Sequence, residues 1–408
     1  MSYRIADVEV TQPLPTLRLG GDEDGLAVLF RRNGRPLDFQ LIPLAPGAIL
    51  GPERLSAAVA TGAGVRLLES SLRVELAGPL EPSARLRLSV TVAICTRDRP
   101  ADLHKCLASV LALRDGDNPA DLEVLVVDNA PSTAATRELV ASLPGIRYTL
   151  EPRPGLDFAR NRALHEAAGE VVAFLDDDVR ADRGWLAGLM EALGEHPDAA
   201  CVTGLVLPAE LATRAQLLFE RRGGFRRGFD KLRYSGSELE SNRLYPTGAG
   251  IFGVGCNMAF RRQVMLDLGE FDNALDTGPP LPGGGDLDAF YRVVRAGQPL
   301  VYEPRMLVFH RHRRDLDSLR RQYRSWGTGF MAFVAKCWGA DPSQRAKLAR
   351  LVAWWCNAQL RELRSARRDG DRLRRRMVTA ELLGGFAGLA GGYRRSRRRV
   401  AAIRRTYP

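Results

Sequence analysis

The sequence feature that most constrains the fold is an alternation, from residue 89 to about residue 260, of apolar runs with helix-like segments. The apolar runs are LSVTVAICT, LEVLVVDN, IRYTLE, EVVAFLDDD, AACVTGLVL and GVGCNMAF, and the segments between them include ADLHKCLASVLAL, LDFARNRALHEAAG and GWLAGLMEALGEH. Continuous apolar strands separated by helices are typical of a mostly parallel sheet with helices on both faces. We therefore expect an α/β domain here.

Polar residues follow three of these predicted strands where the strands end. They are Thr96, Arg97 and Asp98 after the first strand, Asp128 and Asn129 after the second, and Asp176, Asp177 and Asp178 after the fourth. Ligands of open α/β sheets bind in the crevice beyond the carboxyl ends of the strands. An isolated aspartate there can also cap a helix or form a turn, and for Asp98 and Asp128 both interpretations stay open.

Three consecutive aspartates are harder to explain as helix caps. Like charges so close together repel and raise one another's pKa unless a cation or several hydrogen-bond donors offset them. In a turn, Asp176 and Asp178 can face one pocket while Asp177 points away. Their oxygens suit Mg²⁺ or Mn²⁺ that shares its coordination with a substrate phosphate. The chain has no G-x-x-x-x-G-K-[ST] loop and no G-x-G-x-x-G after its first α/β strand, so we expect the metal to bind the phosphates.

Two further regions flank the α/β domain. Residues 1–88 alternate short strand-like runs with turn clusters before a predicted helix near PERLSAAVATGA, and we expect a small β-rich accessory module there. Residues 331–408 are predicted to be helical and rich in arginine. From Arg311 to the end the chain has 25 Lys and Arg but 7 Asp and Glu, whereas the whole chain has 59 and 48. We therefore expect the C-terminal region to meet any anionic partner.

The C-terminal region also has an apolar stripe, because Leu348, Leu351, Val352 and Trp355 recur at helical spacing. Such a helix either lies on an anionic membrane surface or packs on the protein's own sheet, and the sequence leaves both options open. The chain shows no signal-peptide pattern and no run of about 18 apolar residues, and its six cysteines are scattered without a C-x-x-C pair. We expect a cytoplasmic protein with reduced cysteines, with peripheral attachment to the inner membrane face as a further option.

Several ordered segments resemble family 2 glycosyltransferases, which have the GT-A fold. They are VTVAICTRDRPADLHKCLASVLAL, LEVLVVDNAPS, GLDFARNRALHEAAGEVVAFLDDD, GCNMAFRR and GGGDLDAFYRVVRAGQPLVYEPRMLVFHRH. The resemblance covers about residues 89–330, which we expect to form the catalytic domain. It implies a nucleotide-sugar donor, a hydroxyl acceptor on a glycan, lipid-linked or small molecule, Mg²⁺ or Mn²⁺ as cofactor, and inversion of the anomeric configuration.

The resemblance also implies a role for individual residues. Asp286 would be the catalytic base and Asp178 a metal ligand, with His310 near the metal or the diphosphate. The nucleotide sugar would be bound by a larger set of residues, namely Thr96, Arg97, Asp128, Arg160, Asp176 and Asn257. The alternatives are that Asp286 only caps the helix that follows, that Asp288 is the base, and that His310 is structural; we expect His312 to be solvated.

The chain departs from the family pattern at residue 285. Family members usually have Glu directly before the base, where this chain has Gly285, which puts acceptor binding in doubt more than the base. The segment QYRSW has the letters of the Q-x-x-R-W motif of processive synthases at the wrong spacing, so we expect a single transfer per encounter. Two other functions remain as alternatives: a metal-dependent nucleotidyl or phosphoryl transferase, and a nucleic-acid-binding protein acting through the basic tail. The absence of aromatic-interleaved RNA-binding signatures and the acidic strand ends argue against nucleic acid.

Overall fold

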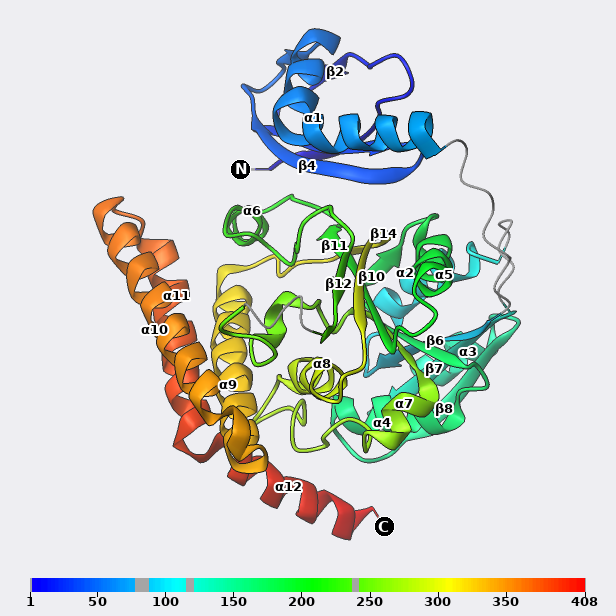
Figure 1. The fold of residues 1–408 in the computed structure, drawn as a ribbon, viewed down its shortest axis with the longest axis vertical. Helices are drawn as coiled ribbons and strands as arrows, with labels where there is room; N and C mark the ends of the chain where they lie inside the picture. The colour runs from blue at the N-terminus through cyan, green and yellow to red at the C-terminus, as the bar shows by residue number, and fades with distance from the viewer. Residues whose placement is uncertain (1, 78–87, 115–120, 237–241, 408) are drawn as a thin grey trace.

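A mixed central sheet forms the middle of the molecule in the computed structural model, which describes residues 2–77, 88–114, 121–236 and 242–407 (Figure 1). Its strand order is β10-β14-β11-β13-β9-β6-β7-β8, and β12 also pairs with β14. The strands are β6 Ser89–Thr96, β7 Asp121–Asn129, β8 Ile146–Glu151, β9 Val171–Asp176, β10 Val179–Ala181, β11 Cys201–Pro208, β12 Leu232–Tyr234, β13 Asn257–Arg261 and β14 Leu300–His310. The pairs β6/β7, β6/β9, β7/β8 and β11/β14 are parallel, while β13 runs antiparallel to both β9 and β11.

Helices cover both faces of this sheet, because alternate residues of each strand point to opposite sides. In β6, Val92 and Ile94 belong to the same core cluster as residues of α2 and α5, whereas Ala93 belongs to the cluster on the other face, with residues of α4 and α8. The helices around the sheet are α2 Pro100–Leu111, α3 Ala135–Ala141, α4 Leu156–Glu166, α5 Trp185–Glu195, α6 Arg214–Arg221, α7 Arg262–Asp267, α8 Gly285–Arg295 and the 3₁₀ turn η2 Ala249–Ile251. The predicted α/β class and parallel-rich sheet are therefore confirmed.

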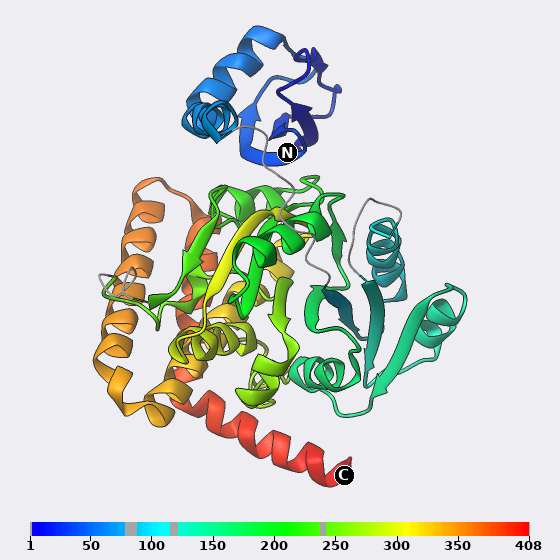
Figure 2. The same cartoon turned by 45° about the vertical axis from the view of Figure 1, so that its right-hand side comes forward.

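The N-terminal region is a small β-rich module that packs on the central domain (Figures 1 and 2). Strands β1 Arg4–Glu9, β3 Gly25–Arg32 and β4 Arg35–Pro43 form one sheet, and β2 Leu17–Arg18 pairs with β5 Ile49–Leu50. One side of β3, including Leu26 and Phe30, packs under helix α1 Pro52–Ala77. The other side, Ala27 and Leu29, belongs to the main core of the molecule. Residues 78–87, just before the predicted domain boundary at 88, lie outside the described residues.

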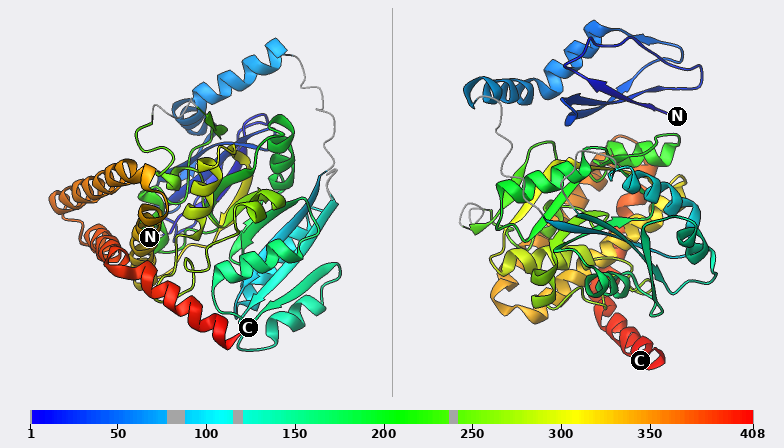
Figure 3. Two further views of the ribbon diagram at one scale, coloured as in Figure 1. Left: turned by 60° about the horizontal axis from the view of Figure 1, so that its bottom comes forward. Right: turned by 90° about the vertical axis from the view of Figure 1, so that its right-hand side faces the viewer.

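The C-terminal region consists of helices that pack along one side of the central domain (Figures 1 and 3). They are α9 Leu316–Ala340, η3 Pro342–Gln344, α10 Arg345–Arg368, α11 Arg372–Ala387, the π-turn η4 Gly388–Gly392 and α12 Tyr393–Thr406. The proposed boundary at residue 330 falls inside α9. The buried residues of α10 include Leu348, Leu351 and Trp355, so its apolar stripe faces the protein. Among the described helices, none is long and apolar enough to span a bilayer.

Candidate active site

The sheet brings the predicted strand-end residues to one edge. In the parallel register of β6 with β7, Thr96 lies beside Asp128, and in the register of β6 with β9, Cys95 lies beside Asp176. Asp128 is completely buried and accepts a hydrogen bond from the Tyr148 hydroxyl through Oδ2 at 3.0 Å, while its Oδ1 has no hydrogen-bond partner among the described residues. Burial raises the pKa of Asp128. Its free acceptor atom is the kind of group that a donor on a ligand could satisfy.

The acidic turn after β9 is neutralised mainly by Arg99, a residue that the sequence analysis did not single out. The guanidinium of Arg99 bonds Asp177 at 2.5 Å and Asp178 at 2.9 Å, and Thr96 Oγ1 donates to Asp177 at 2.7 Å. Burial raises the pKa of Asp177 to about 7 despite this contact. Burial also acts on Asp178, but the charges of His310 and Arg99 outweigh it and hold the pKa of Asp178 below its usual range.

The two histidines at the end of β14 lie on the other side of Asp178. His310 Nε2 is 3.3 Å from Asp178 Oδ1, and His310 Nδ1 is 3.0 Å from His312 Nδ1. His312 Nε2 is in turn 2.8 Å from Glu220 Oε1. The expectation that His312 is solvated is therefore wrong, because its side chain is buried against Phe219 and Phe225. Burial lowers the pKa of His312, which favours the neutral ring.

Arg160, predicted to approach the nucleotide sugar, lies inside a buried acidic cluster. It bonds Asp157 at 2.9 Å, lies 3.4 Å from Asp276, and stacks over the Phe271 ring. Burial raises the pKa of Asp157 well above its usual value and that of Asp276 to about 6. Neither aspartate was recognised in the sequence. The signal in GLDFARN was the i, i+3 spacing of Asp157 and Arg160, which places both on one face of α4.

Asp286 lies in the first turn of α8, close to the acidic turn of β9. Its Oδ2 accepts a hydrogen bond from the Gly255 amide at 3.0 Å and its Oδ1 from the Leu287 amide at 2.8 Å. The antiparallel register of β13 with β9 pairs Asn257 with Leu175, so Gly255 and Cys256 come next to Asp176. The negative charges of Asp176, Asp178 and Asp286 all act on the Cys256 thiol, whose pKa is raised chiefly by burial. The structure thus brings the candidate base and the acidic turn together.

The N-terminal turn of α8 is held by other groups as well. The helix cap is Gly284, without a side-chain capping bond, so Asp286 is not the residue that caps α8. Asp288 is buried and pairs with Arg292 at 2.8 Å and Lys336 at 2.6 Å, which suits a bracing role. A Cβ added to Gly285 would lie 2.2 Å from Asp157 Oδ2 and 2.7 Å from Asp276 Oδ2. The glycine at this position therefore makes room for these two carboxylates.

Two predicted donor-site residues occupy different surroundings. Asn257 is completely buried, its amide nitrogen donates to the Leu205 and Met306 carbonyls, and its oxygen accepts from the Trp185 indole. This side chain braces β13 and has no polar atom free to wall a sugar site, so the expected contact of Asn257 with the donor is not supported by its geometry. Arg97 is exposed, with its guanidinium 3.8 Å from Asp98.

The site offers two adjacent ligand atoms to a divalent cation. Within the described part of the chain, no group of three or more His, Cys, Asp or Glu side chains forms a metal cage. Asp178 Oδ1 and His310 Nε2 are nevertheless adjacent, at 3.3 Å. Neighbouring ligands of an octahedral cation with bonds of about 2.1 Å lie about 3 Å apart, so these two atoms fit as one edge of a coordination shell. The remaining positions would have to come from substrate and water.

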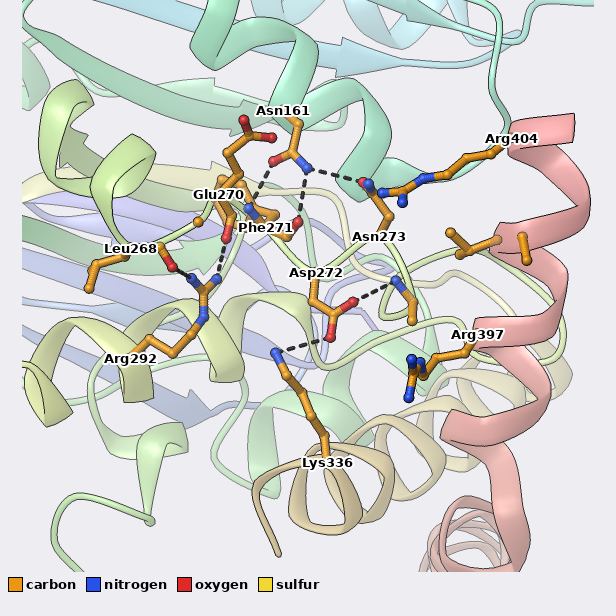
Figure 4. Close-up of a pocket in the computed structure, with 14 residues that line it drawn as sticks. Asn161, Leu268, Glu270, Phe271, Asp272, Asn273, Arg292, Lys336, Arg397 and Arg404 are labelled. Atoms are coloured by element: carbon orange, nitrogen blue, oxygen red, sulfur yellow. Dashed lines mark hydrogen bonds and ion pairs between the residues drawn. The ribbon is translucent and has the colours of Figure 1, made fainter. Parts of the chain in front are cut away.

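A cavity of about 580 Å³ lies away from these residues (Figure 4). It is lined by the loop from Leu268 to Ala274, by Lys336 of α9 and by Arg397 and Arg404 of α12. Its charges are largely paired, as in the ion pair of Lys336 with Asp272 at 3.0 Å. None of the predicted site residues lines it, and we do not assign the catalytic chemistry to it.

Comparison with known proteins identifies similar glycosyltransferases. The family model "Glycosyl transferase family 2" matches residues 91–269, which include β6, the acidic turn and β13. The pre-mycofactocin glycosyltransferase of Mycobacterium tuberculosis is 29% identical over 72% of this chain and 56% of its own length. The succinoglycan biosynthesis protein ExoM of Rhizobium meliloti is 28% identical over 74% of this chain and 94% of its own length. These matches support a family 2 glycosyltransferase domain in this part of the chain.

Two further similarities concern a relative and a solved structure. The glucosyl-dolichyl phosphate glucuronosyltransferase of Haloferax volcanii is 24% identical over 60% of this chain and 76% of its own length. A mannosyltransferase of Pyrobaculum calidifontis, solved with GDP-Man and Mn²⁺, aligns with a TM-score of 0.49 and 19% identity over 82% of this chain and 97% of its own. The chain spans little more than half the length of the mycobacterial relative.

Proposed function

We propose that the chain transfers a sugar from a nucleotide-sugar donor to a hydroxyl acceptor with inversion at the anomeric carbon. The observation that carries this proposal is the convergence of Asp286 with the acidic turn of residues 176–178 at the carboxyl end of β9. Asp286 would accept the proton of the acceptor hydroxyl, while Asp178 would hold the metal ion that binds the leaving diphosphate.

The nucleotide would lie across the ends of β6 and β7. Asp128 offers Oδ1 as a buried acceptor, which an N–H of the nucleobase could satisfy. Thr96 and Arg97 would line the same pocket, and Asp176 would lie by the ribose. Arg160 would contribute positive charge beside the diphosphate, although Asp157 and Asp276 already balance part of that charge.

Asp178 and His310 would hold Mg²⁺ or Mn²⁺. When bound, such an ion acts as a Lewis acid for the negative charge that develops on a departing diphosphate. The fit of the two ligand atoms as one edge of a coordination shell supports this assignment. Arg99 and Arg313, at 2.9 Å and 3.7 Å from Asp178, would add further positive charge beside the phosphates.

Asp286 would accept the proton of the attacking hydroxyl. The Gly255 and Leu287 amides hold its carboxylate in place, and Gly283 and Gly284 precede it. A carboxylate within hydrogen-bond reach of the hydroxyl typically contributes about 10²–10⁴-fold to the rate. Attack on the face opposite the diphosphate would invert the anomeric configuration.

The acceptor is proposed to be a glycan or a lipid-linked molecule. The named relatives act in succinoglycan biosynthesis and on a dolichyl phosphate carrier, according to their names. The C-terminal helices expose Trp354, Leu383, Phe386 and Leu389 among many arginines. We propose that this surface contacts an anionic membrane that presents the acceptor.

The proposal is tested by incubating the protein with a panel of nucleotide sugars and Mn²⁺. We expect release of a nucleoside diphosphate, loss of that release in Asp178→Ala, and a 10²–10⁴-fold lower kcat in Asp286→Asn with little change in donor KM. The exposed Asp198→Asn serves as the matched control. Release of a nucleoside monophosphate would indicate a nucleotidyl transferase, and binding of nucleic acid without turnover would indicate a nucleic-acid-binding protein.

A further inference from the structure

A continuous chain of polar contacts runs from Asp178 into the protein interior. It passes from Asp178 to His310 at 3.3 Å, from His310 to His312 at 3.0 Å, and from His312 to Glu220 at 2.8 Å. All four side chains are buried. We propose that Glu220 and His312 are positioning residues that fix His310 as the nitrogen ligand of the cation. This inference rests on the metal site of the proposed function.

The direction of each hydrogen bond in this series follows from the contact of His312 with Glu220. A carboxylate only accepts, so the contact with Glu220 requires that His312 donates from Nε2. A neutral His312 then has an unprotonated Nδ1, which must accept from His310 Nδ1. His310 therefore keeps its Nε2 toward Asp178, where either a proton or a cation can lie between the two atoms.

The surroundings hold both imidazole rings in place. Phe225 packs edge-on against His310 and His312, with ring centroids 5.0 Å and 5.7 Å away, and Phe219 lies 4.7 Å from His312. Gly224 has a φ of +56°, and a Cβ there would lie 2.2 Å from Glu220 Oε1. The aromatic rings thus limit rotation of the two histidines, and the close backbone at Gly224 limits movement of the Glu220 carboxylate.

The effect of such an arrangement is to raise the basicity of a metal-binding imidazole and to fix its orientation. Outer partners of metal-bound histidines typically change metal affinity by about 10–100-fold when they are removed. Glu220 comes from the last turn of α6 and the histidines from the end of β14. The proposal thus gives α6, which lies outside the acidic turn, a role in cation binding.

The first test measures Mn²⁺ affinity of the full-length protein by water-proton relaxation, without donor or acceptor. We expect His312→Phe, which keeps an aromatic ring of similar size, to weaken Mn²⁺ binding by about 10–100-fold, and Glu220→Gln to weaken it in the same direction. Asp178→Ala and His310→Ala should abolish binding. His165→Gln, on an exposed histidine, should leave it unchanged.

The outcomes separate this inference from the proposed function. If Asp178→Ala and His310→Ala abolish binding while His312→Phe and Glu220→Gln bind Mn²⁺ like the wild type, the positioning role is overturned and the metal site stands. If all four variants bind like the wild type, the metal site itself is overturned.

A second test needs no substitution and so does not depend on a variant folding. The chain has five histidines, and ¹⁵N NMR of their rings distinguishes protonated from unprotonated nitrogens. With Cd²⁺ as a diamagnetic probe, we expect His312 protonated at Nε2 alone and His310 protonated at Nδ1 alone. His312 protonated at Nδ1 alone would overturn the proposal.

Discussion

At the scale of single residues, the site depends on how buried negative charge is balanced. Asp176, Asp177 and Asp178 follow one another at the end of β9, and burial together with the charge of Asp178 raises the pKa of Asp176. Arg99 bridges the other two carboxylates. A divalent cation bound at Asp178 would neutralise part of the negative charge that Arg99 neutralises in the metal-free protein.

Arg99→Ala is therefore expected to destabilise the metal-free protein by roughly 1.5–3 kcal/mol, because two buried carboxylates lose their charged partner. Mn²⁺ should raise the unfolding temperature of this variant more than that of the wild type. Thermal unfolding with and without Mn²⁺ measures both effects. The exposed Arg97→Ala is the matched control, and an equal Mn²⁺ shift in Arg99→Ala and the wild type would contradict this account.

Asp128 is expected to select the nucleobase. Uracil and guanine present an N–H on the edge where cytosine and adenine have an unprotonated nitrogen, so an unpaired carboxylate oxygen favours the first two. We expect UDP and GDP to bind more tightly than CDP and ADP in calorimetric titrations. Asp128→Asn should reduce that preference by about tenfold, whereas Tyr148→Phe, which leaves Oδ1 free, should keep it. Tighter binding of ADP to the wild type would refute the assignment.

The residues proposed from the sequence have a recognisable local position, whereas the residues that were missed interact with distant parts of the chain. Asp128, Asp176, Asp178 and Asp286 were proposed from the sequence because they follow a strand or begin a helix within a recognisable segment. Arg99, Glu220 and Asp276 were missed, since each matters through a partner far away in the chain, as Glu220 does through His312. Burial of His312 was also not predictable, because the aromatic rings that cover it come from residues 219–225.

At the scale of helices and strands, apolar patterning predicted the strands β6, β7, β8, β9, β11 and β13 of the central sheet, but not β10, β12 or β14. The predicted run IRYTLE coincides with β8, and each predicted strand and helix of the α/β domain is present. The sequence could not show how the C-terminal helices pack. Helices α9 and α11 approach so closely that a Cβ on Gly327 would lie 2.0 Å from the Glu381 carbonyl, and one on Gly384 would lie 2.0 Å from the Arg324 carbonyl.

Gly384→Ala is consequently expected to force α9 and α11 apart and to destabilise the protein by about 1–3 kcal/mol. Chemical denaturation monitored by circular dichroism measures this loss. Gly339→Ala is the matched control: none of the described residues has an atom within 4 Å of a Cβ there, so we expect it to be neutral or stabilising by up to about 1 kcal/mol. A Gly384→Ala variant as stable as the wild type would show that the helices can move apart without loss.

Because of Glu381 in α11, we expect the stability of the protein to depend on pH. Burial raises the pKa of Glu381 from 4.5 to about 7, against the opposing charge of Arg222. The folded state therefore binds the proton more tightly than the unfolded state, and the stability from this group is full below pH 4.5 and is lost as the pH rises toward 7. Glu381→Gln should remove this decline in thermal unfolding between pH 5 and pH 8. If the stability of Glu381→Gln falls as steeply with pH as that of the wild type, Glu381 is not the source of the decline.

At the scale of the whole molecule, the C-terminal region has two different sides. Its buried side completes the enzyme: Val400 and Ile403 of α12 pack with Phe158 and Ala274, and Ser396 bonds Thr277 beside Asp276. Its outer side exposes arginines and large apolar side chains such as Phe386, which is 69% exposed. Helix α12 therefore supports the loop that contains Ala274 and Thr277.

The outer side is expected to bind vesicles that contain anionic lipid and not vesicles of neutral lipid alone. Each basic residue near such a surface contributes about 1 kcal/mol, so binding should weaken as salt is raised from about 50 to 500 mM. Phe386→Asp should reduce vesicle binding in co-sedimentation by about tenfold. Leu68→Asp, on the exposed side of α1, is the control. Equal binding to neutral vesicles would contradict the electrostatic part of this account.

Because strand β3 is buried on both sides, the N-terminal module cannot be removed without exposing part of the main core. Ala27 and Leu29 close the main core next to Leu205 and Leu211, and Arg31 reaches across to Asp182 at 2.7 Å. A shortened protein starting at residue 88 would expose the apolar surface that β3 covers to solvent, and it should therefore self-associate. Supplied as a separate peptide, residues 1–77 should dock back onto it and restore solubility, so the two pieces would behave as subunits of one enzyme.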